Sequence, residues 1–586
     1  MNIKDIIEEK LSEVILNVYQ LKEINLEVQE NKTEYEGDFT IVTFPLVKQL
    51  KKNPESIGIE LGESLTAQTD LFESFNVIKG FLNVKVKNQF FVDQLRSVTE
   101  GFSKIEKKAA TVMVEYSSPN TNKPLHLGHI RNNLLGFSVA QILKEAGYDV
   151  IKSQIINDRG IHICKSMLAW EKFGNGETPE TTHTKGDKFV GNYYVEFDKN
   201  YKKEIAGLIE QGVGEDEAKK EAPLMKEAQK MLLDWESGDE KVRNLWNEMN
   251  SWVYAGFNET YKRLGVDFDQ VQYESNTYIL GKDLIQEGLD KGILYQKEDG
   301  SVWCDLTDEG LDQKLLLRSD GTSVYMTQDL GTAVERFKQN DIQKLIYTVG
   351  NEQDYHFQVL FKIMKKLGYE WADQLFHLSY GMVELPEGKM KSREGTVVDA
   401  DDLMEEMHKT AELKAKENGR LEELNEEEKE ASYETIGMGA LKYFMLKVDP
   451  KKKMLFNPAD SIDFNGNTGP FIQYTYARIQ SLLTKAGYTQ KEVTSVNLNQ
   501  SEKELIMQLA NYKTVVAKAA EILSPALVAN YLYDLVKSYN SFYQNNPIMI
   551  QEDENIKQTL LNLSDLTGQT IKKSLGLLGI GTVNRM

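Results

Sequence analysis

The sequence predicts an α/β protein of several domains, with a Rossmann-type parallel-sheet core between an N-terminal α+β domain and a C-terminal all-helical domain. Three observations predict this class. The 586 residues are too many for one hydrophobic core and suit three or four domains. A strand pattern, a helix pattern and a second strand pattern follow one another between Val112 and Ile156. From Asp399 onwards the apolar residues recur almost entirely at helical spacing.

The first domain is expected over residues 1–108, where helical and strand patterns mix. Residues 80–86 alternate apolar and polar side chains after Gly80, which is typical of a half-buried strand. The core domain is expected over 109–400. Val112, Val114 and Tyr116 form a short apolar run typical of a buried strand, and a helix then extends towards Gly147.

Residues 150–156 form the next strand pattern, so the three elements predict a parallel β-α-β unit. The Lys- and Glu-rich stretch at about 174–246 indicates helices inserted into this domain. Residues 375–385 are again strand-like and precede a loop marked by Pro386, Gly388 and Gly395. We expect a helical connection over 401–463 and a final helical domain over 464–586.

Composition sets limits on location and partners. The net charge of -21 argues against broad, nonspecific binding to nucleic acid, because phosphate binding relies on Lys and Arg. Two cysteines, Cys164 and Cys304, provide neither a disulfide framework nor a C-x-x-C zinc motif. Residues 1–14 do not resemble a signal peptide, and no apolar run approaches membrane-spanning length. We therefore expect a cytoplasmic protein that binds neither membranes nor DNA.

The most informative segment is S-S-P-N-T-N-K-P-L-H-L-G-H at 117–129, where the predicted strand gives way to the helix. His126 and His129 lie three residues apart at the first helical turn, so both imidazoles can face one side and donate hydrogen bonds to phosphate oxygens. Gly128 leaves room for a flat purine against the backbone. Ligands of parallel sheets sit at such strand ends beside helix N-termini, so a nucleotide-phosphate site is predicted. Alone, the pattern could equally be two surface histidines.

The whole segment from Glu115 to Gly136 resembles the first signature of class I aminoacyl-tRNA synthetases, in the form S-S-P-N-x-N-K-P-x-H-x-G-H-x-R-N-N found in arginyl-tRNA synthetases. The resemblance implies that His126 and His129 bind ATP and stabilise its α-phosphate while the arginine carboxylate attacks, with Gly128 in the ATP site. It also implies Mg²⁺ entering with the nucleotide and no structural metal.

A second segment, G-K-M-K-S-R at 388–393, resembles the K-M-S-K-S loop of the same class, whose lysines neutralise the pyrophosphate leaving group. The match is partial, because Lys391 stands at the third position and a serine at the fourth, where the general pattern has its second lysine. The resemblance implies a catalytic role for Lys389 and Lys391, and ATP contacts from three residues of the loop: Lys389, Met390 and Ser392.

Arginyl enzymes with this departure carry a lysine just upstream of the H-x-G-H, which is understood to replace the missing charge. In this chain that residue is Lys123. The alternative is that Lys391, one position from the expected lysine on a flexible loop, reaches the same phosphate. Both possibilities stay open at the level of sequence.

Recognition of arginine requires carboxylates that can hold a planar guanidinium by paired hydrogen bonds. Y-M-T-Q-D at 325–329 resembles the family's Y-x-T-x-D and places Tyr325 and Asp329 on one helical face. The resemblance implies Glu115 as second carboxylate, with Asn120 and Gln353 holding the α-amino and carboxylate groups of the substrate. In the ordinary alternative, Asp329 pairs with Arg336 and Tyr325 lies in the core.

Two further segments imply contacts with tRNA. Residues 1–108 resemble the domain that arginyl enzymes place against the tRNA elbow, with Phe81 and Asn83 at the base-contacting positions. G-N-T-G-P-F-I-Q-Y-T-Y-A-R at 466–478 resembles the opening of the family's anticodon-binding domain, where Tyr474 and Arg478 share a helical face. The alternatives are Phe81 in the core with Asn83 in a turn, and Tyr474 in helix packing.

Together these resemblances imply a monomeric arginine–tRNA ligase that uses ATP to form arginyl-adenylate and transfers arginine to the 3′ end of tRNA(Arg), releasing AMP and pyrophosphate. Two rival interpretations are another class I synthetase and a catalytically silent synthetase-like RNA-binding protein. Tyr325, Asp329 and the G-N-T-G-P segment disfavour the first. The presence of both signature histidines disfavours the second.

Overall fold

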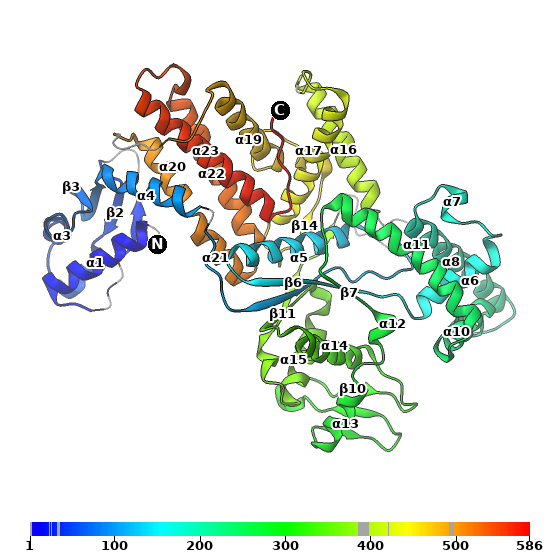
Figure 1. Ribbon diagram of the computed structural model, residues 1–586. Helices are drawn as coiled ribbons and strands as arrows, with labels where there is room; N and C mark the ends of the chain where they lie inside the picture. Colours follow the sequence, from blue (N-terminus) through cyan, green and yellow to red (C-terminus); the bar gives the residue numbers. More distant parts are fainter. Residues whose placement is uncertain are drawn as a thin grey trace.

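The computed structural model describes residues 3–22, 24, 26–31, 36–102, 104–384, 398–419, 421–491 and 497–586. A central parallel sheet lies between four outlying parts (Figure 1). The N-terminal domain is at the left of the view, the inserted helices are at the right, a smaller αβ part is below, and the C-terminal helices are above. The predicted fold class is confirmed.

The N-terminal domain packs helices on a four-stranded antiparallel sheet of order β1-β2-β4-β3. Leu82, Val84 and Val86 are fully buried on β4, as the alternating pattern predicts. The elements are α1 (Ile3–Tyr19), β1 (Val28–Glu30), β2 (Phe39–Val42), α2 (Phe44–Leu50), α3 (Pro54–Gln68), β3 (Phe72–Ile78), β4 (Phe81–Val86) and α4 (Asn88–Gly101).

The central sheet has the order β12-β11-β5-β6-β7, and every pair in it is parallel. Its elements are β5 (Thr111–Glu115), α5 (Leu127–Glu145), β6 (Asp149–Ile156), β7 (Gln270–Tyr273), β11 (Lys344–Gly350) and β12 (Leu375–Tyr380). The predicted β-α-β unit is β5-α5-β6, with Gly147 in the left-handed conformation after α5. Because β5 is the middle strand, the segment after Glu115 emerges between β11 and β6.

The polar stretch expected as inserted helices forms a helical part on one side of the sheet, which begins one helix earlier than predicted. Its helices are α6 (Ile161–Phe173), α7 (Pro179–Thr182), α8 (Gly186–Glu210), α9 (Glu215–Glu221), α10 (Pro223–Ser237) and α11 (Glu240–Leu264). The last of these continues well past Trp246, because its C-terminal half carries buried residues such as Phe257 and Leu264.

A second insertion, not foreseen from the sequence, contains a three-stranded antiparallel sheet of order β10-β9-β8. Its elements and those that return to the central sheet are α12 (Glu274–Thr277), α13 (Lys282–Asp290), β8 (Leu294–Gln296), β9 (Val302–Cys304), η1 (Thr307–Glu309), β10 (Lys314–Leu317), α14 (Tyr325–Asn340), η2 (Asn351–Gln353), α15 (Asp354–Lys366) and η3 (Glu370–Gln374).

Among the remaining described residues the regular structure is helical, apart from one short parallel pair, β13 with β14. The elements are β13 (Val383–Glu384), α16 (Ala400–Glu417), α17 (Glu426–Leu446), β14 (Met454–Leu455), α18 (Pro458–Ser461), α19 (Gly469–Lys485), α20 (Gln500–Ala510), α21 (Tyr512–Ile522), α22 (Pro525–Asn545), η4 (Ile548–Ile550) and α23 (Glu554–Leu577). None of the helices in the described ranges combines the length and apolar character needed to cross a bilayer.

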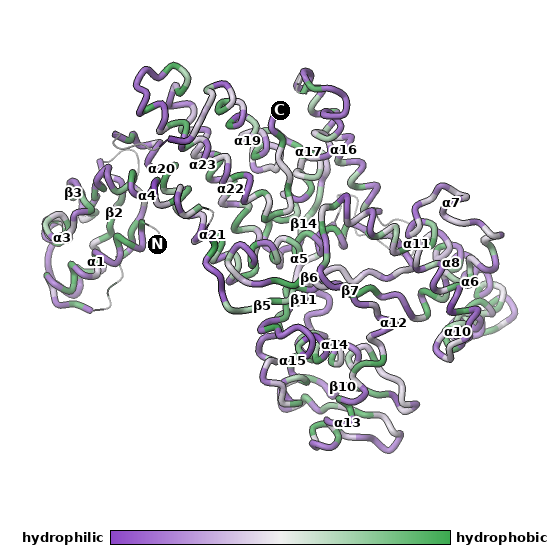
Figure 2. Tube along the Cα trace, in the orientation of Figure 1, coloured by the Kyte–Doolittle hydropathy of each residue, from purple (hydrophilic) through white to green (hydrophobic). Residues whose placement is uncertain are grey.

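The last helices pack directly on α5. The Ser138 hydroxyl of α5 donates to the Leu577 carbonyl over 2.8 Å. The residues that follow α23 are also tied to α17, where the buried Lys442 donates to the Gly579 carbonyl over 2.5 Å. Hydrophobic residues are dense in the strands at the centre, where Met113 and Val114 are fully buried (Figure 2). The helix that begins with the two histidines is therefore enclosed by the sheet on one side and the C-terminal helices on the other.

Candidate active site

The start of α5 is held against the carboxyl ends of two neighbouring strands. Ser117 adopts a left-handed conformation, with φ of 63°, and turns the chain away from β5. Its backbone N–H donates to the Asn132 side-chain oxygen over 2.6 Å, and the Asn132 amide donates to the Thr348 carbonyl of β11 over 2.6 Å. A buried amide of α5 thus bridges β5 and β11 and fixes where the helix N-terminus points.

The two histidines cap this helix reciprocally. Nδ1 of His126 accepts from the Gly128 N–H, and Nδ1 of His129 accepts from the His126 N–H, both over 3.1 Å. The ring centroids are 3.9 Å apart. Because each Nδ1 is an acceptor, the proton of each neutral ring resides on Nε2. Each ring therefore keeps one N–H donor for a ligand.

Both histidines are uncharged near neutral pH. Burial, with a smaller contribution from the charge of Lys123, lowers the pKa of His126 to about 4. Burial, with His126 and Lys123, places the pKa of His129 well below its ordinary value. The rings thus act as fixed neutral donors at the N-terminus of a helix, where an anion is favoured.

The local geometry also requires a glycine at position 128, independently of any space for a nucleotide base. A β-carbon at this position would lie 3.0 Å from Cε1 of His126 and 3.2 Å from its Nδ1, closer than ordinary packing allows. The glycine is therefore needed for the His126 ring to fold back onto the helix end.

Lys123 lies close enough to lower the pKa of both histidines, and burial lowers its own pKa. A partly desolvated ammonium beside two neutral donors is suited to a polyanionic ligand. Lys389, Met390, Lys391 and Ser392 lie outside the described residues. The structure therefore does not compare Lys123 with Lys391.

The described residues that flank the second signature lie beside the first. Residues 398–400 pair antiparallel with 125–127: the Leu127 N–H donates to the Val398 carbonyl over 3.2 Å, and the Ala400 N–H to the Leu125 carbonyl over 2.9 Å. On the upstream side, the buried Arg131 of α5 donates to the Gly381 carbonyl over 2.9 Å. Both ends of the segment that carries the second signature are thus anchored near the first turns of α5.

The residues expected to bind arginine also lie at the carboxyl edge of the central sheet. Two of them have hydrogen-bond partners that the sequence did not predict. Glu115, at the end of β5, forms a buried ion pair with Arg336. Asp329 is instead bonded to Nε2 of His356 over 2.6 Å. The alternative pairing of Asp329 with Arg336 is therefore wrong, because Arg336 points to Glu115. Glu115, one of the two carboxylates expected to bind arginine, is therefore already paired with the guanidinium of Arg336.

Tyr325 is the first residue of α14 and is 72% exposed, so the alternative of a core tyrosine is also wrong. It lines a cavity of about 420 Å³ together with Arg159, Glu274 and Gln328. Asn120 is exposed, and its backbone pairs with that of Asn157 in an isolated parallel β-bridge. Gln353 is exposed in η2, directly after β11.

Glu274 is a candidate that sequence reasoning missed. It is buried, and this burial, with the charges of Asp158 and Asp329 and against that of Arg159, raises its pKa to about 7. The available signal was positional: Glu274 directly follows β7, so it shares the carboxyl edge of the sheet with Glu115.

The two residues expected at the tRNA elbow share one face of β4 but differ in exposure. Phe81 is 41% exposed and packs edge-on against Phe44. Asn83 is 3% exposed in the middle of β4, where its oxygen accepts from Thr40 over 2.7 Å and its amide donates to Asn76 over 2.8 Å. Asn83 lies on the same face of β4 as Phe81, opposite Leu82 and Val84, and the side chains of Thr40 and Asn76 on the neighbouring strands cover it there.

Tyr474 and Arg478 meet on α19 as their spacing predicts. The Arg478 guanidinium lies 4.8 Å from the centre of the Tyr474 ring and donates to the Asn540 oxygen of α22 over 3.0 Å. Both side chains are half-buried.

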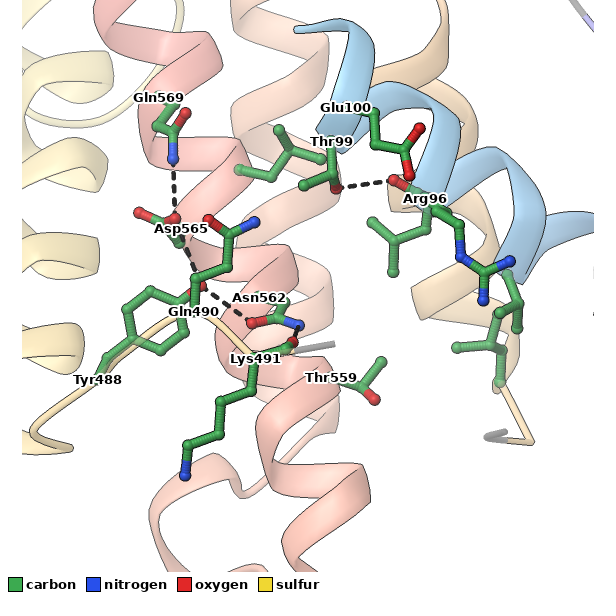
Figure 3. Close-up of a pocket in the computed structure, with 14 residues that line it drawn as sticks. Arg96, Thr99, Glu100, Tyr488, Gln490, Lys491, Thr559, Asn562, Asp565 and Gln569 are labelled. Atoms are coloured by element: carbon green, nitrogen blue, oxygen red, sulfur yellow. Dashed lines mark hydrogen bonds between the residues drawn. The ribbon is translucent and has the colours of Figure 1, made fainter. Parts of the chain in front are cut away.

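A cavity of about 410 Å³ lies apart from all these residues, between α4 and α23 (Figure 3). It is lined by polar side chains such as Arg96, Lys491, Asn562 and Asp565. Several are already satisfied by one another: the Asn562 amide donates to the Lys491 carbonyl, and Gln569 to Asp565. None of the signature residues lines it, so the candidate site remains the edge of the central sheet.

The chain matches three known families over most of its length. Residues 1–86 match the arginyl tRNA synthetase N-terminal domain, 92–457 the catalytic domain of tRNA synthetases class I (R), and 472–586 the DALR anticodon binding domain.

Similar proteins and structures agree with these matches. The chain is 56% identical to the arginine–tRNA ligase of Flavobacterium psychrophilum, with 100% of both chains covered, and 54% identical to that of Bacteroides thetaiotaomicron, with 99% and 100% covered. Its fold resembles the arginyl-tRNA synthetase of Thermus thermophilus, with a TM-score of 0.78, 24% identity and full coverage of both chains. It also resembles that of Plasmodium falciparum, with a TM-score of 0.74, 20% identity and 100% and 99% covered.

Proposed function

Because the chain belongs to the arginyl-tRNA synthetases, class I enzymes that use ATP to charge tRNA with arginine, we propose that the carboxyl edge of its central sheet, around His126 and His129, is where arginyl-adenylate forms. The observation that carries the proposal is the reciprocal cap. It leaves two Nε2–H donors side by side at a helix N-terminus.

In the first step, a carboxylate oxygen of arginine attacks the α-phosphorus of ATP. A new P–O bond forms, the bond to the β-phosphate breaks, and pyrophosphate leaves. In the second step, a hydroxyl of the terminal tRNA ribose attacks the carbonyl carbon of the adenylate, and AMP leaves. The Nε2–H groups would donate to α-phosphate oxygens as charge grows on them, and their fixed orientation means that little reorganisation is needed.

Lys123 is proposed to hold the phosphates that leave as pyrophosphate, with Lys389 and Lys391 contributing from the second signature. Burial disfavours the ammonium of Lys123 in the absence of a partner, and an arriving polyanion removes that penalty. Mg²⁺ is proposed to enter with ATP. In that case the phosphates supply much of its coordination, as is usual for this ion.

Arginine is proposed to lie between β5 and α14. Asp329 and Glu115 would accept from its guanidinium beside the Tyr325 ring, and Asn120 and Gln353 would hold its α-amino and carboxylate groups. Since Glu115 is already bonded to Arg336, the substrate would share this carboxylate. Glu274, facing the same cavity as Tyr325, is a third acidic group that the cation would bring into its ionised form.

We propose tRNA contacts from Phe81 and Asn83 in the N-terminal domain and from Tyr474 and Arg478 in the final helical domain. The division into 1–108, 109–400 with its insertion, 401–463 and 464–586 is proposed on the same basis. We further propose that the enzyme acts as a monomer in the cytoplasm. The two buried free cysteines, Cys164 and Cys304, fit a reducing compartment.

The substrate proposal is tested by charging assays with each standard amino acid, on the wild type and on Asp329→Ala. We expect charging with arginine alone. Asp329→Ala should raise the KM for arginine by roughly a hundredfold, because it removes a charge partner used in the ground state. Asp341→Ala, at the exposed end of the same helix, is the control. An unchanged KM for arginine in a folded Asp329→Ala would remove Asp329 from the pocket.

A further inference from the structure

The beginning of α8 touches both halves of the proposed ATP site. Gly191 packs against the first signature: a β-carbon there would lie 2.9 Å from Cδ of Pro124 and 3.5 Å from Cα of Lys123. Only a hydrogen atom fits comfortably between α8 and this backbone. The inserted helices therefore reach the lysine that precedes His126, although they diverge from the sheet elsewhere (Figure 1).

The same end of α8 holds the residues that follow the second signature. The ammonium of Lys185 lies 2.6 Å from an oxygen of Asp401, near the start of α16, and 3.1 Å from an oxygen of Asp187. It also donates to the Thr260 hydroxyl of α11 over 2.5 Å, and that hydroxyl is 3.1 Å from both Asp401 oxygens. Asp187 is fully buried, so this is an internal polar cluster rather than a surface ion pair.

Only a short stretch of paired backbone connects Asp401 to His126. Residues 398–400 pair with the backbone on either side of His126, and Asp399 caps α16 by accepting from the Asp401 N–H over 2.8 Å. A displacement of Asp401 is therefore passed to His126 through two residues of hydrogen-bonded backbone. Although burial opposes it, the two carboxylates hold the pKa of Lys185 above its ordinary value, so the connection stays ionic.

We propose that Lys185, Asp187 and Gly191 form a clamp that fixes Lys123 and His126 relative to the start of α16, and that Lys185 and Gly191 are positioning residues for adenylate formation. The inference rests on the proposed ATP site. Its physical basis is that donors to a developing anion act only when held in place, so that a shift of a fraction of an ångström is costly.

The first test compares two glycines of α8 that undergo the same change. Gly191→Ala must push on Pro124, whereas a β-carbon at Gly207 meets nothing within 4 Å. Both substitutions improve helix propensity equally. In arginine-dependent ATP–pyrophosphate exchange with tRNA present, Gly191→Ala should lower kcat about tenfold or more and raise the KM for ATP, with the KM for arginine unchanged. Gly207→Ala should behave as wild type.

The second test compares two neighbouring aspartates of α16. Asp401→Asn removes the ionic connection to α8 but leaves Lys185 paired with Asp187. Asp402→Asn makes the same change to a carboxylate whose partner, Lys188, is nearly half exposed. We expect Asp401→Asn to reproduce the kinetic pattern of Gly191→Ala and Asp402→Asn to leave it unchanged. Lys185→Arg, which keeps the charge, should retain more activity than Lys185→Met.

The clamp is overturned if Gly191→Ala and Asp401→Asn both keep the wild-type kcat and KM for ATP. It is also overturned if both variants slow every step of the reaction to a similar extent and lower the melting temperature in parallel. That is the behaviour of a purely structural cluster. His126→Ala is measured alongside. If it leaves exchange intact, the proposed ATP site itself fails; if it abolishes exchange while the clamp variants do not affect it, only the clamp fails.

Discussion

At the scale of single residues, Lys123 is the side chain whose role the geometry sharpens most. It precedes a helix N-terminus, it is partly desolvated, and it lies close enough to lower the pKa of two histidines. If it supplies charge to the leaving phosphates, Lys123→Ala should lower kcat by roughly a hundredfold while arginine affinity changes little. Single-turnover adenylate formation measures this directly.

Lys391→Ala is the matched variant, since it removes the competing ammonium from the second signature. We expect the smaller loss from Lys391→Ala, because a charge held beside a helix end, as that of Lys123 is, is preorganised for the phosphates. A larger loss in Lys391→Ala than in Lys123→Ala would refute compensation by Lys123.

At the scale of the element, the cap of α5 ties the stability of the helix end to pH. The cap requires Nδ1 of His126 to accept a hydrogen bond, which a protonated ring cannot do. The pKa of His126 falls from 6.5 in the open chain to about 4 in the folded site. Its contribution is therefore complete above about pH 6.5 and is lost as pH falls towards 4, amounting to roughly 2 kcal/mol between pH 7 and pH 5.

His126→Asn provides the comparison, because asparagine caps helices well and does not titrate in this range. We expect the free energy of local opening at the start of α5, measured by hydrogen exchange, to fall between pH 7 and pH 5 in the wild type and by a smaller amount in His126→Asn, in which only His129 of the cap still titrates. Equal pH dependence in the two proteins would mean that His126 does not form the cap as a neutral acceptor.

At the scale of the whole molecule, the C-terminal helices pack on α5 and, in our proposal, contact tRNA. A truncation removes both at once. The helices pack on α5 through contacts such as Ser138 with Leu577, so deletion from about residue 464 should abolish charging and also uncover α5. A full-length variant is more informative. Arg478→Gln should raise the KM for tRNA several-fold, since it removes a cation available to RNA phosphates and bases.

Asn540→Ala is the control for Arg478→Gln, because it removes the hydrogen bond that holds the guanidinium but keeps its charge. If both variants raise the KM for tRNA equally, Arg478 acts through helix packing rather than through contact with RNA. That result would favour the packing alternative for Tyr474 as well.

The sequence by itself determined the features that depend on residues close together in the chain. The β5-α5-β6 unit and the facing of His126 and His129 follow from residues within about forty positions, because strand period, helix period and capping are local properties. The shared face of Tyr325 and Asp329 and that of Tyr474 and Arg478 follow from the helical repeat for the same reason. Family and activity were predicted from such contiguous motifs, and the comparisons confirm both.

Only the tertiary structure decided which side chains meet across long separations. Arg336 bonds to Glu115 rather than to Asp329, Asn83 is covered by Thr40 and Asn76 of the neighbouring strands, and Glu274 lines the same cavity as Tyr325. Lys185 reaches Asp401 from a helix of the insertion. In each case the partner is chosen by how helices and sheets pack, and a buried charge or amide takes whichever partner the packing brings near, since it cannot remain without one. No local pattern contains that information.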